Sequence, residues 1–246
     1  MNQRVNDAPP GDSILIVSPH LDDAVLSCWT VIAGEGNVTV ATVFTAGPKV
    51  GITTPWDRDS GVDSAERMAQ RRDEDAAALA LAGRVPLHLG ALERQYGGGR
   101  VPPDVLAPLI REATTVLAPA GTGTIQKNTE HRVVRDAVRR LRPDCWLYAD
   151  QPYSGFAQAV RLPWRLRAAH AVRRSRSIFE PFPVRLSEEE QEWKAAAIRC
   201  YAGELGKLEW IFGPITQRGR LGYELFWIPR GSGSVAAPFC SPGRSE

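Results

Sequence analysis

The sequence predicts an α/β protein whose strands form one mostly parallel β-sheet. Up to about Asp150, short apolar runs typical of buried strands alternate with segments that carry helical periodicity and helix-capping residues. This alternation produces βαβ units, in which parallel strands pack between layers of helices. We therefore expect a Rossmann-like three-layer sandwich with a less regular C-terminal third.

The expected strands follow from apolar runs. The first is the continuous run from Ile14 to Val17, and the others are expected at 38–44, 85–89, 114–117 and 145–149. The segment between Thr45 and Asp63 is rich in Gly, Pro and Thr, which predicts a long loop. Loops of that length in compact domains are often functional.

Residues that typically begin or end helices predict where the helices lie. They lie at 24–33, 64–82, 102–113, 130–141 and from 186 towards 205. Gly34 closes the first, and the second begins at Ser64 and is followed by Gly83. A Pro-Pro pair opens the third, and Pro143 lies just beyond the fourth.

Composition predicts one domain and excludes several classes of protein. With 246 residues and a 43% hydrophobic fraction, the chain can form one large core, so we expect a single domain over 1–246 with flexible tails at 1–12 and 230–246. The 30 Lys+Arg against 28 Asp+Glu leave a net charge of +2, which argues against a nucleic-acid partner. No apolar run reaches the roughly 20 residues of a membrane span. The first residues lack an apolar signal core and the four cysteines lack CxxC spacing, so we expect a cytoplasmic protein.

A histidine and two carboxylates follow the first predicted strand. His20, Asp22 and Asp23 lie where ligands bind in open α/β sheets, outside the carboxyl ends of the strands. Zinc favours imidazole nitrogen with carboxylate oxygen, and a second carboxylate could then move a proton. The alternative is structural, because Asp22 or Asp23 could cap the following helix.

A third zinc ligand has to come from the remaining histidines. His88 lies within a short apolar strand, which favours a structural core residue. His170 lies in an arginine-rich stretch, which is typical of a solvated face. His131 follows a Gly/Thr loop after a predicted strand, at the same edge of the sheet as His20. His131 is therefore the best candidate.

These residues resemble motifs of the LmbE/PIG-L-like zinc-dependent N-deacetylases, in their bacterial branch. The family pattern (A/S)HPDD(E/A) is similar to Ser18-Pro19-His20-Leu21-Asp22-Asp23-Ala24, and its HxDH is similar to Asn128-Thr129-Glu130-His131. Further similarities extend the resemblance over about residues 14 to 228: the RxxE segment at Arg71, LGxxD at Glu93, DxPY at Asp150 and K-x6-Y at Lys194.

The resemblance implies a hydrolase that removes the acetyl group from an N-acyl amino sugar or a glycosylated metabolite, with a role in bacterial secondary metabolism. His20, Asp23 and His131 would bind Zn²⁺, and Asp22 would be the general base for a zinc-held water that attacks the amide. Arg71 and Glu93 match positions that contact the sugar in the family. Separately, Trp56 in the long loop could stack on a sugar or aglycone.

Two positions depart from the family. Asn128 replaces a histidine that stabilises the oxyanion; asparagine can donate a hydrogen bond but cannot carry a proton, so we keep Asn128 as a candidate catalytic residue. Glu130 replaces an aspartate. The main alternative is therefore an impaired or repurposed member that acts as a binding protein or on a different substrate. A magnesium-dependent phosphohydrolase built on Asp22 and Asp23 is a third hypothesis, which the two histidines disfavour.

Overall fold

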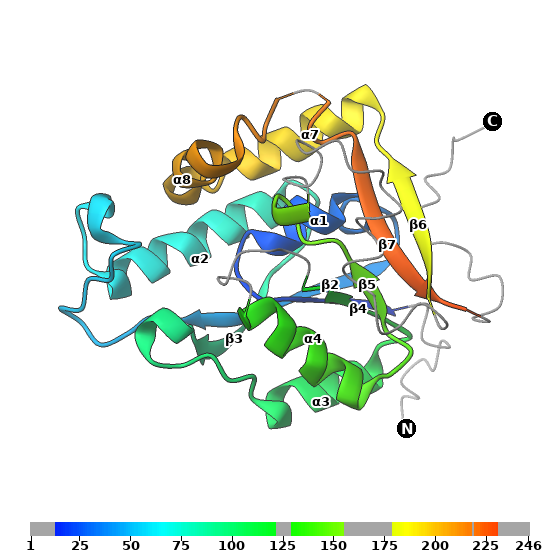
Figure 1. Ribbon diagram of the computed structural model, residues 1–246, viewed down its shortest axis with the longest axis horizontal. Coiled ribbons are helices and arrows are strands. Elements are labelled where there is room, and N and C mark those ends of the chain that lie inside the picture. The colour runs from blue at the N-terminus through cyan, green and yellow to red at the C-terminus, as the bar shows by residue number, and fades with distance from the viewer. Residues whose placement is uncertain (1–12, 122–128, 155–178, 218, 231–246) are drawn as a thin grey trace, which may run out of the picture.

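The computed structural model describes residues 13–121, 129–154, 179–217 and 219–230, and in these it has the expected layered architecture (Figure 1). One seven-stranded sheet runs in the order β3 (Leu87–Leu92), β2 (Asn37–Ala46), β1 (Ser13–Ser18), β4 (Thr115–Pro119), β5 (Trp146–Tyr148), β7 (Tyr223–Pro229) and β6 (Phe179–Arg185). The pairs from β3 to β5 are parallel, and β7 is antiparallel to both β5 and β6. The prediction of a mostly parallel α/β sheet is confirmed.

Helices cover both faces of this sheet (Figure 1). The helices on one face are α1 (Asp23–Ile32), α2 (Ser64–Ala80), α7 (Glu188–Arg199) and α8 (Ala202–Phe212), and those on the other are α3 (Pro103–Glu112) and α4 (Thr129–Leu141). The sequence of β1 is apolar throughout because helices cover both of its faces. Ile14 and Ile16 face the first helical layer, while Leu15 and Val17 face the second. None of the helices in the described ranges is both long and apolar enough to cross a bilayer.

The C-terminal third differs most from the expectation. Strands β6 and β7 were not predicted. Strand β6 contains Pro181 and Pro183, and proline normally argues against a strand. Both prolines are tolerated because β6 is an edge strand of the sheet. The single helix expected from 186 towards 205 is instead two, α7 and α8, which separate at Cys200 and Tyr201.

The strand order creates a crevice beside β1. From β1 the chain adds β2 and β3 on one side, and it then returns to place β4 and β5 on the other. The connections that leave β1 and β4 therefore diverge, and ligands of open α/β sheets bind at such a switch point. The loop after β1 carries His20, and the connection after β4 leads to His131 in the first turn of α4.

A buried ion pair fixes helix α1 against the C-terminal strands. The helix is interrupted at Cys28, whose backbone has non-helical angles (φ −134°, ψ 26°). Backbone N–H groups at such a break need other acceptors, and Trp29 and Thr30 donate theirs to the Glu224 carboxylate at 2.8 and 3.0 Å. Lys194 of α7 completes the arrangement, with its Nζ 2.6 Å from Glu224 Oε1 and both side chains buried.

We predict that Glu224→Gln lowers the free energy of unfolding by roughly 3–5 kcal/mol, because it leaves the buried Lys194 ammonium without its counter-charge. Urea denaturation followed by far-UV circular dichroism measures the change. Glu180→Gln, at an exposed position on the neighbouring strand β6, is the matched control and should be nearly neutral. Equal effects of the two substitutions would contradict this role of Glu224.

Candidate active site

The loop between β1 and α1 presents the first three candidate residues. Ser18 Oγ donates to the His20 carbonyl at 2.7 Å, and the His20 backbone N–H donates to Asp23 Oδ2 at 3.0 Å, so the loop is internally bonded. Asp22 occupies the N-cap position of α1, but its side chain makes no capping hydrogen bond. The capping alternative therefore does not account for the Asp22 carboxylate.

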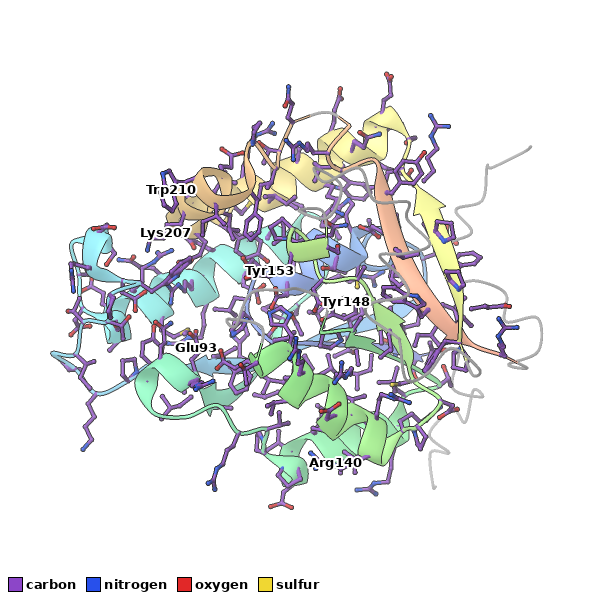
Figure 2. All side chains as sticks on the ribbon, viewed as in Figure 1. Glu93, Arg140, Tyr148, Tyr153, Lys207 and Trp210 are labelled. Atoms are coloured by element: carbon purple, nitrogen blue, oxygen red, sulfur yellow. The ribbon has the colours of Figure 1, made fainter. Side chains whose placement is uncertain are left out.

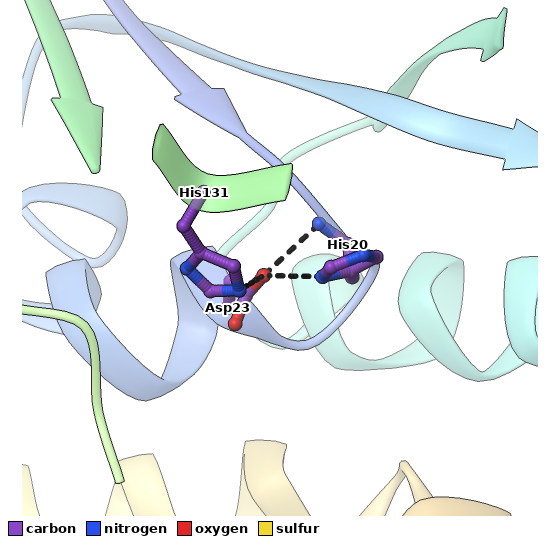
Figure 3. Close-up of side chains that lie close together, drawn as sticks. All are labelled: His20, Asp23 and His131. Carbon is purple, nitrogen blue, oxygen red and sulfur yellow. Dashed lines mark hydrogen bonds and ion pairs between the residues drawn. The ribbon is translucent and has the colours of Figure 1, made fainter. Parts of the chain in front are cut away.

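The structure brings His20, Asp23 and His131 together, although 111 residues separate the two histidines (131 − 20 = 111). Asp23 Oδ2 lies 3.1 Å from Nδ1 of His20 and 3.3 Å from Nε2 of His131. One potential ligand atom from each residue lies within 4.8 Å of the other two. Figure 3 shows the three side chains pointing toward one another, from the β1–α1 segment and from α4.

Carboxylates also contact the far nitrogens of both imidazoles. His131 Nδ1 lies 2.7 Å from Asp150 Oδ1, and His20 Nε2 lies 3.2 Å from Glu130 Oε2. Burial by itself would lower the pKa of each histidine, but these carboxylates and Asp23 outweigh it and raise the pKa of both. The surroundings therefore favour positive charge at this point.

The donor set fits zinc. Two imidazole nitrogens and one carboxylate oxygen match the three protein ligands that catalytic zinc sites commonly use, and they leave a position for water or substrate. A magnesium site would use mainly oxygen ligands and water. His20, Asp23 and His131 are thus the residues that could hold a metal ion, and the negative surroundings described above suit a cation.

A cavity of about 800 Å³ opens beside these residues. Burial raises the pKa of the Asp22 carboxyl to about 7, and the neighbouring Asp23 and Glu204 carboxylates add to the effect. Glu93 and Tyr153, both labelled in Figure 2, line the cavity from the segments that follow β3 and β5. The other lining residues include His20, Asp22, Trp56, Arg71, Arg94, Glu130, Tyr201, Glu204 and Leu208.

Arg71 and Trp56 lie on the cavity wall as one bonded group. Arg71 Nε donates to Glu204 Oε1 at 2.8 Å and its Nη2 donates to Asp57 Oδ1 at 2.6 Å. Trp56 Nε1 donates to the other oxygen of Glu204 at 2.7 Å, and the Lys207 ammonium lies 5.1 Å from the centre of the Trp56 ring. The Arg71 fork is therefore already bound to carboxylates, while the Trp56 ring is held at the cavity.

Glu93 has a different environment. Its side chain is buried, and it accepts a hydrogen bond from the side-chain amide of Gln95. Burial raises the pKa of Glu93, although the charges of His20 and Arg71 oppose that effect. A buried carboxylate with a neutral donor at a cavity wall suits a hydroxyl or amine of a ligand.

Sequence reasoning did not select Glu204 or Tyr201. Glu204 follows the break between α7 and α8, which was not predicted, so the sequence pattern gave no indication that Glu204 lies near Arg71. Tyr201 belongs to the K-x6-Y pattern, but the pattern gives no indication that its hydroxyl donates to Asp75 at 2.8 Å. His88 Nε2 contacts the same Asp75 at 2.9 Å, away from the three converging residues. Asn128 and His170 lie outside the described residues.

Comparisons with known proteins find several similar deacetylases. A curated relative, the 2'-N-acetylparomamine deacetylase of Streptomyces fradiae, is 30% identical over 177 residues, which make up 64% of this chain and 63% of that protein. The zinc-inhibited form of teicoplanin deacetylase matches with a TM-score of 0.67 at 23% identity, over 89% of this chain and 99% of that one. The A40926 pseudoaglycone deacetylase matches with a TM-score of 0.60 at 25% identity, over 88% and 96%. No family model matches the chain.

The chain therefore has the α/β fold of these deacetylases, and the resemblance to proteins of the LmbE/PIG-L type is confirmed. The match covers less than two thirds of the curated relative, at 63% of its length.

The Asp57–Arg71 pair predicts a pH-dependent stability. Burial by itself would raise the pKa of Asp57, but a hydrogen bond from Ser64 and the Arg71 charge outweigh it and lower that pKa below 3.8. A carboxyl with a depressed pKa stabilises the fold above its ordinary pKa and loses this contribution as pH falls through the folded value. Asp57→Asn should therefore destabilise the protein at pH 7 and do so progressively less below about pH 4.

Urea denaturation of both proteins from pH 7 down to pH 3 measures this difference. Asp59→Asn, on the same loop but exposed, is the control and should behave like the wild type. A destabilisation by Asp57→Asn that stays constant over the whole pH range would contradict the ion pair.

Proposed function

We propose that the chain is a zinc-dependent N-deacetylase that hydrolyses the amide of an N-acyl amino sugar or a glycosylated metabolite. The observation that supports this most strongly is the convergence of His20, Asp23 and His131 beside the Asp22 carboxylate, at a cavity of about 800 Å³. The relatives support it further, because they are deacetylases of 2'-N-acetylparomamine, teicoplanin and the A40926 pseudoaglycone, and one was solved in a zinc-inhibited form.

His20, Asp23 and His131 would hold the metal. Zinc bound there would act as a Lewis acid that polarises the amide carbonyl and makes water more acidic. Asp22 is the general base: its carboxylate faces the cavity next to Asp23, takes the proton of the attacking water and passes it to the leaving amine. Asn128 would donate a hydrogen bond to the oxyanion that forms on the carbonyl oxygen.

The cavity wall supports an amino-sugar substrate. A volume of about 800 Å³ exceeds the needs of a monosaccharide and leaves room for an aglycone. Glu93 would accept from a sugar hydroxyl or ammonium, and the Trp56 ring would stack on the apolar face of a sugar ring. Arg71 would contribute to substrate binding as well, because it binds Glu204, which in turn holds the Trp56 indole in place.

The same proposal includes a single domain that works in the cytoplasm. One continuous sheet contains both β1 and β7, which supports a single folding unit across the described residues. Cys28, Cys145 and Cys200 are free thiols, as expected of a reducing compartment.

We predict that zinc removal abolishes amine release and that zinc restores it. The purified protein is offered a panel of N-acetyl amino sugars, acetylated aminoglycosides and glycopeptide conjugates, and free amine is measured before and after treatment with a chelator. His131→Ala should release no amine and should contain no zinc, because it lacks one ligand. Full activity of the metal-free protein would reject the proposed chemistry. Activity only in Asn128→His would favour the repurposed member instead.

We predict that Asp22→Asn loses activity by at least about 10²-fold, since the amide cannot accept the proton, while its zinc content stays that of the wild type. Zinc content and steady-state rates are measured on the same preparation. Asp59→Asn, an exposed aspartate outside the cavity, serves as the matched control. Retained activity in Asp22→Asn would remove Asp22 from the mechanism.

A further inference from the structure

We propose that Glu130 is a positioning residue for the metal site: it orients the His20 imidazole through a hydrogen bond and so sets the affinity for zinc. This inference rests on the proposed function, because it requires that His20 bind the metal. It assigns a purpose to a side chain that differs from the aspartate of the HxDH pattern.

The two ring nitrogens of His20 have different partners. Nδ1 lies 3.1 Å from Asp23 Oδ2 and therefore faces the converging ligand atoms, whereas Nε2 lies 3.2 Å from Glu130 Oε2 and faces away from them. A metal-binding nitrogen carries no proton, so with Nδ1 as ligand the proton stays on Nε2. That N–H then donates to Glu130, which fixes both the tautomer and the ring orientation.

Glu130 is itself held in place. Its second oxygen, Oε1, accepts the backbone N–H of Arg94 at 2.7 Å, and its side chain is 12% exposed. Hydrogen bonds to both oxygens leave the carboxylate little freedom to turn away from His20. Glu130 also precedes His131 directly, so the first turn of α4 supplies one metal-binding candidate and orients the other.

The second histidine has an equivalent partner. His131 Nδ1 lies 2.7 Å from Asp150, and its Nε2 faces Asp23. Each histidine thus offers one nitrogen to the site and binds a carboxylate with the other. The His20–Glu130 pair is the more exposed of the two, with 25% of the His20 side chain accessible against 1% for His131. Glu130 can therefore be replaced with less damage to the core than Asp150.

The test measures zinc affinity rather than activity. Glu130→Ala and Glu130→Gln are titrated with zinc in competition with a chromogenic chelator, and the thermal midpoint of each metal-free protein is recorded. We expect Glu130→Ala to weaken zinc binding 10–100-fold, as is typical when the partner of a ligating histidine is lost. Glu130→Gln, which keeps an acceptor but loses the charge, should fall between Glu130→Ala and the wild type. The metal-free midpoints should stay close to that of the wild type.

The Co²⁺-substituted proteins give an independent signal, because a reoriented His20 changes the visible absorption of the bound cobalt. Glu189→Ala, an exposed glutamate likewise in the first turn of a helix, is the matched control and should leave affinity and spectrum unchanged. If the wild type binds zinc and both Glu130 variants bind it equally well, the inference is overturned and the proposed function stands. If the wild type binds no zinc, the proposed function fails and this inference fails with it.

Discussion

The candidate site depends on one constraint: the Asp23 carboxylate has to lie between two imidazoles that come from distant parts of the chain. Oδ2 of Asp23 lies within 3.1 to 3.3 Å of nitrogens from His20 and His131. The strand order reverses beside β1, and this brings the loop after β1 next to the start of α4. The fold therefore positions the three residues, and the carboxylates behind the histidines orient them.

Part of the cavity wall consists of buried charged side chains that bind one another. Arg71 is bound to Asp57 and Glu204, and Glu204 also holds the Trp56 indole. A buried charge that lost its partner would cost several kcal/mol, so these side chains hold each other in one arrangement. Glu93 and Asp22 differ from this network: both line the cavity, and burial raises the pKa of each carboxyl. This contrast separates the residues that support the wall from the carboxylates that we propose face a substrate.

Much of this arrangement could be predicted from the sequence, for reasons that particular residues make clear. Strand β1 was recognisable because Ile14 to Val17 are apolar on both faces, and His20 and Asp23 follow it within a few residues. His131 was recognisable because its neighbours mark a helix start after a strand. The contacts of Glu204 could not be predicted, because α8 begins at a break that no local signal announces. The prolines of β6 hid an edge strand, and the partner of Glu130 depends on tertiary geometry alone.

The most direct test of the account is a crystal structure of the zinc-loaded protein with anomalous data collected at the zinc edge. The account predicts one strong peak per chain, bonded to Nδ1 of His20, a carboxylate oxygen of Asp23 and Nε2 of His131, with Glu130 still on Nε2 of His20. Zinc distances near 2.0–2.2 Å would match such ligands. A peak elsewhere, or none at these three residues under saturating zinc, would contradict it.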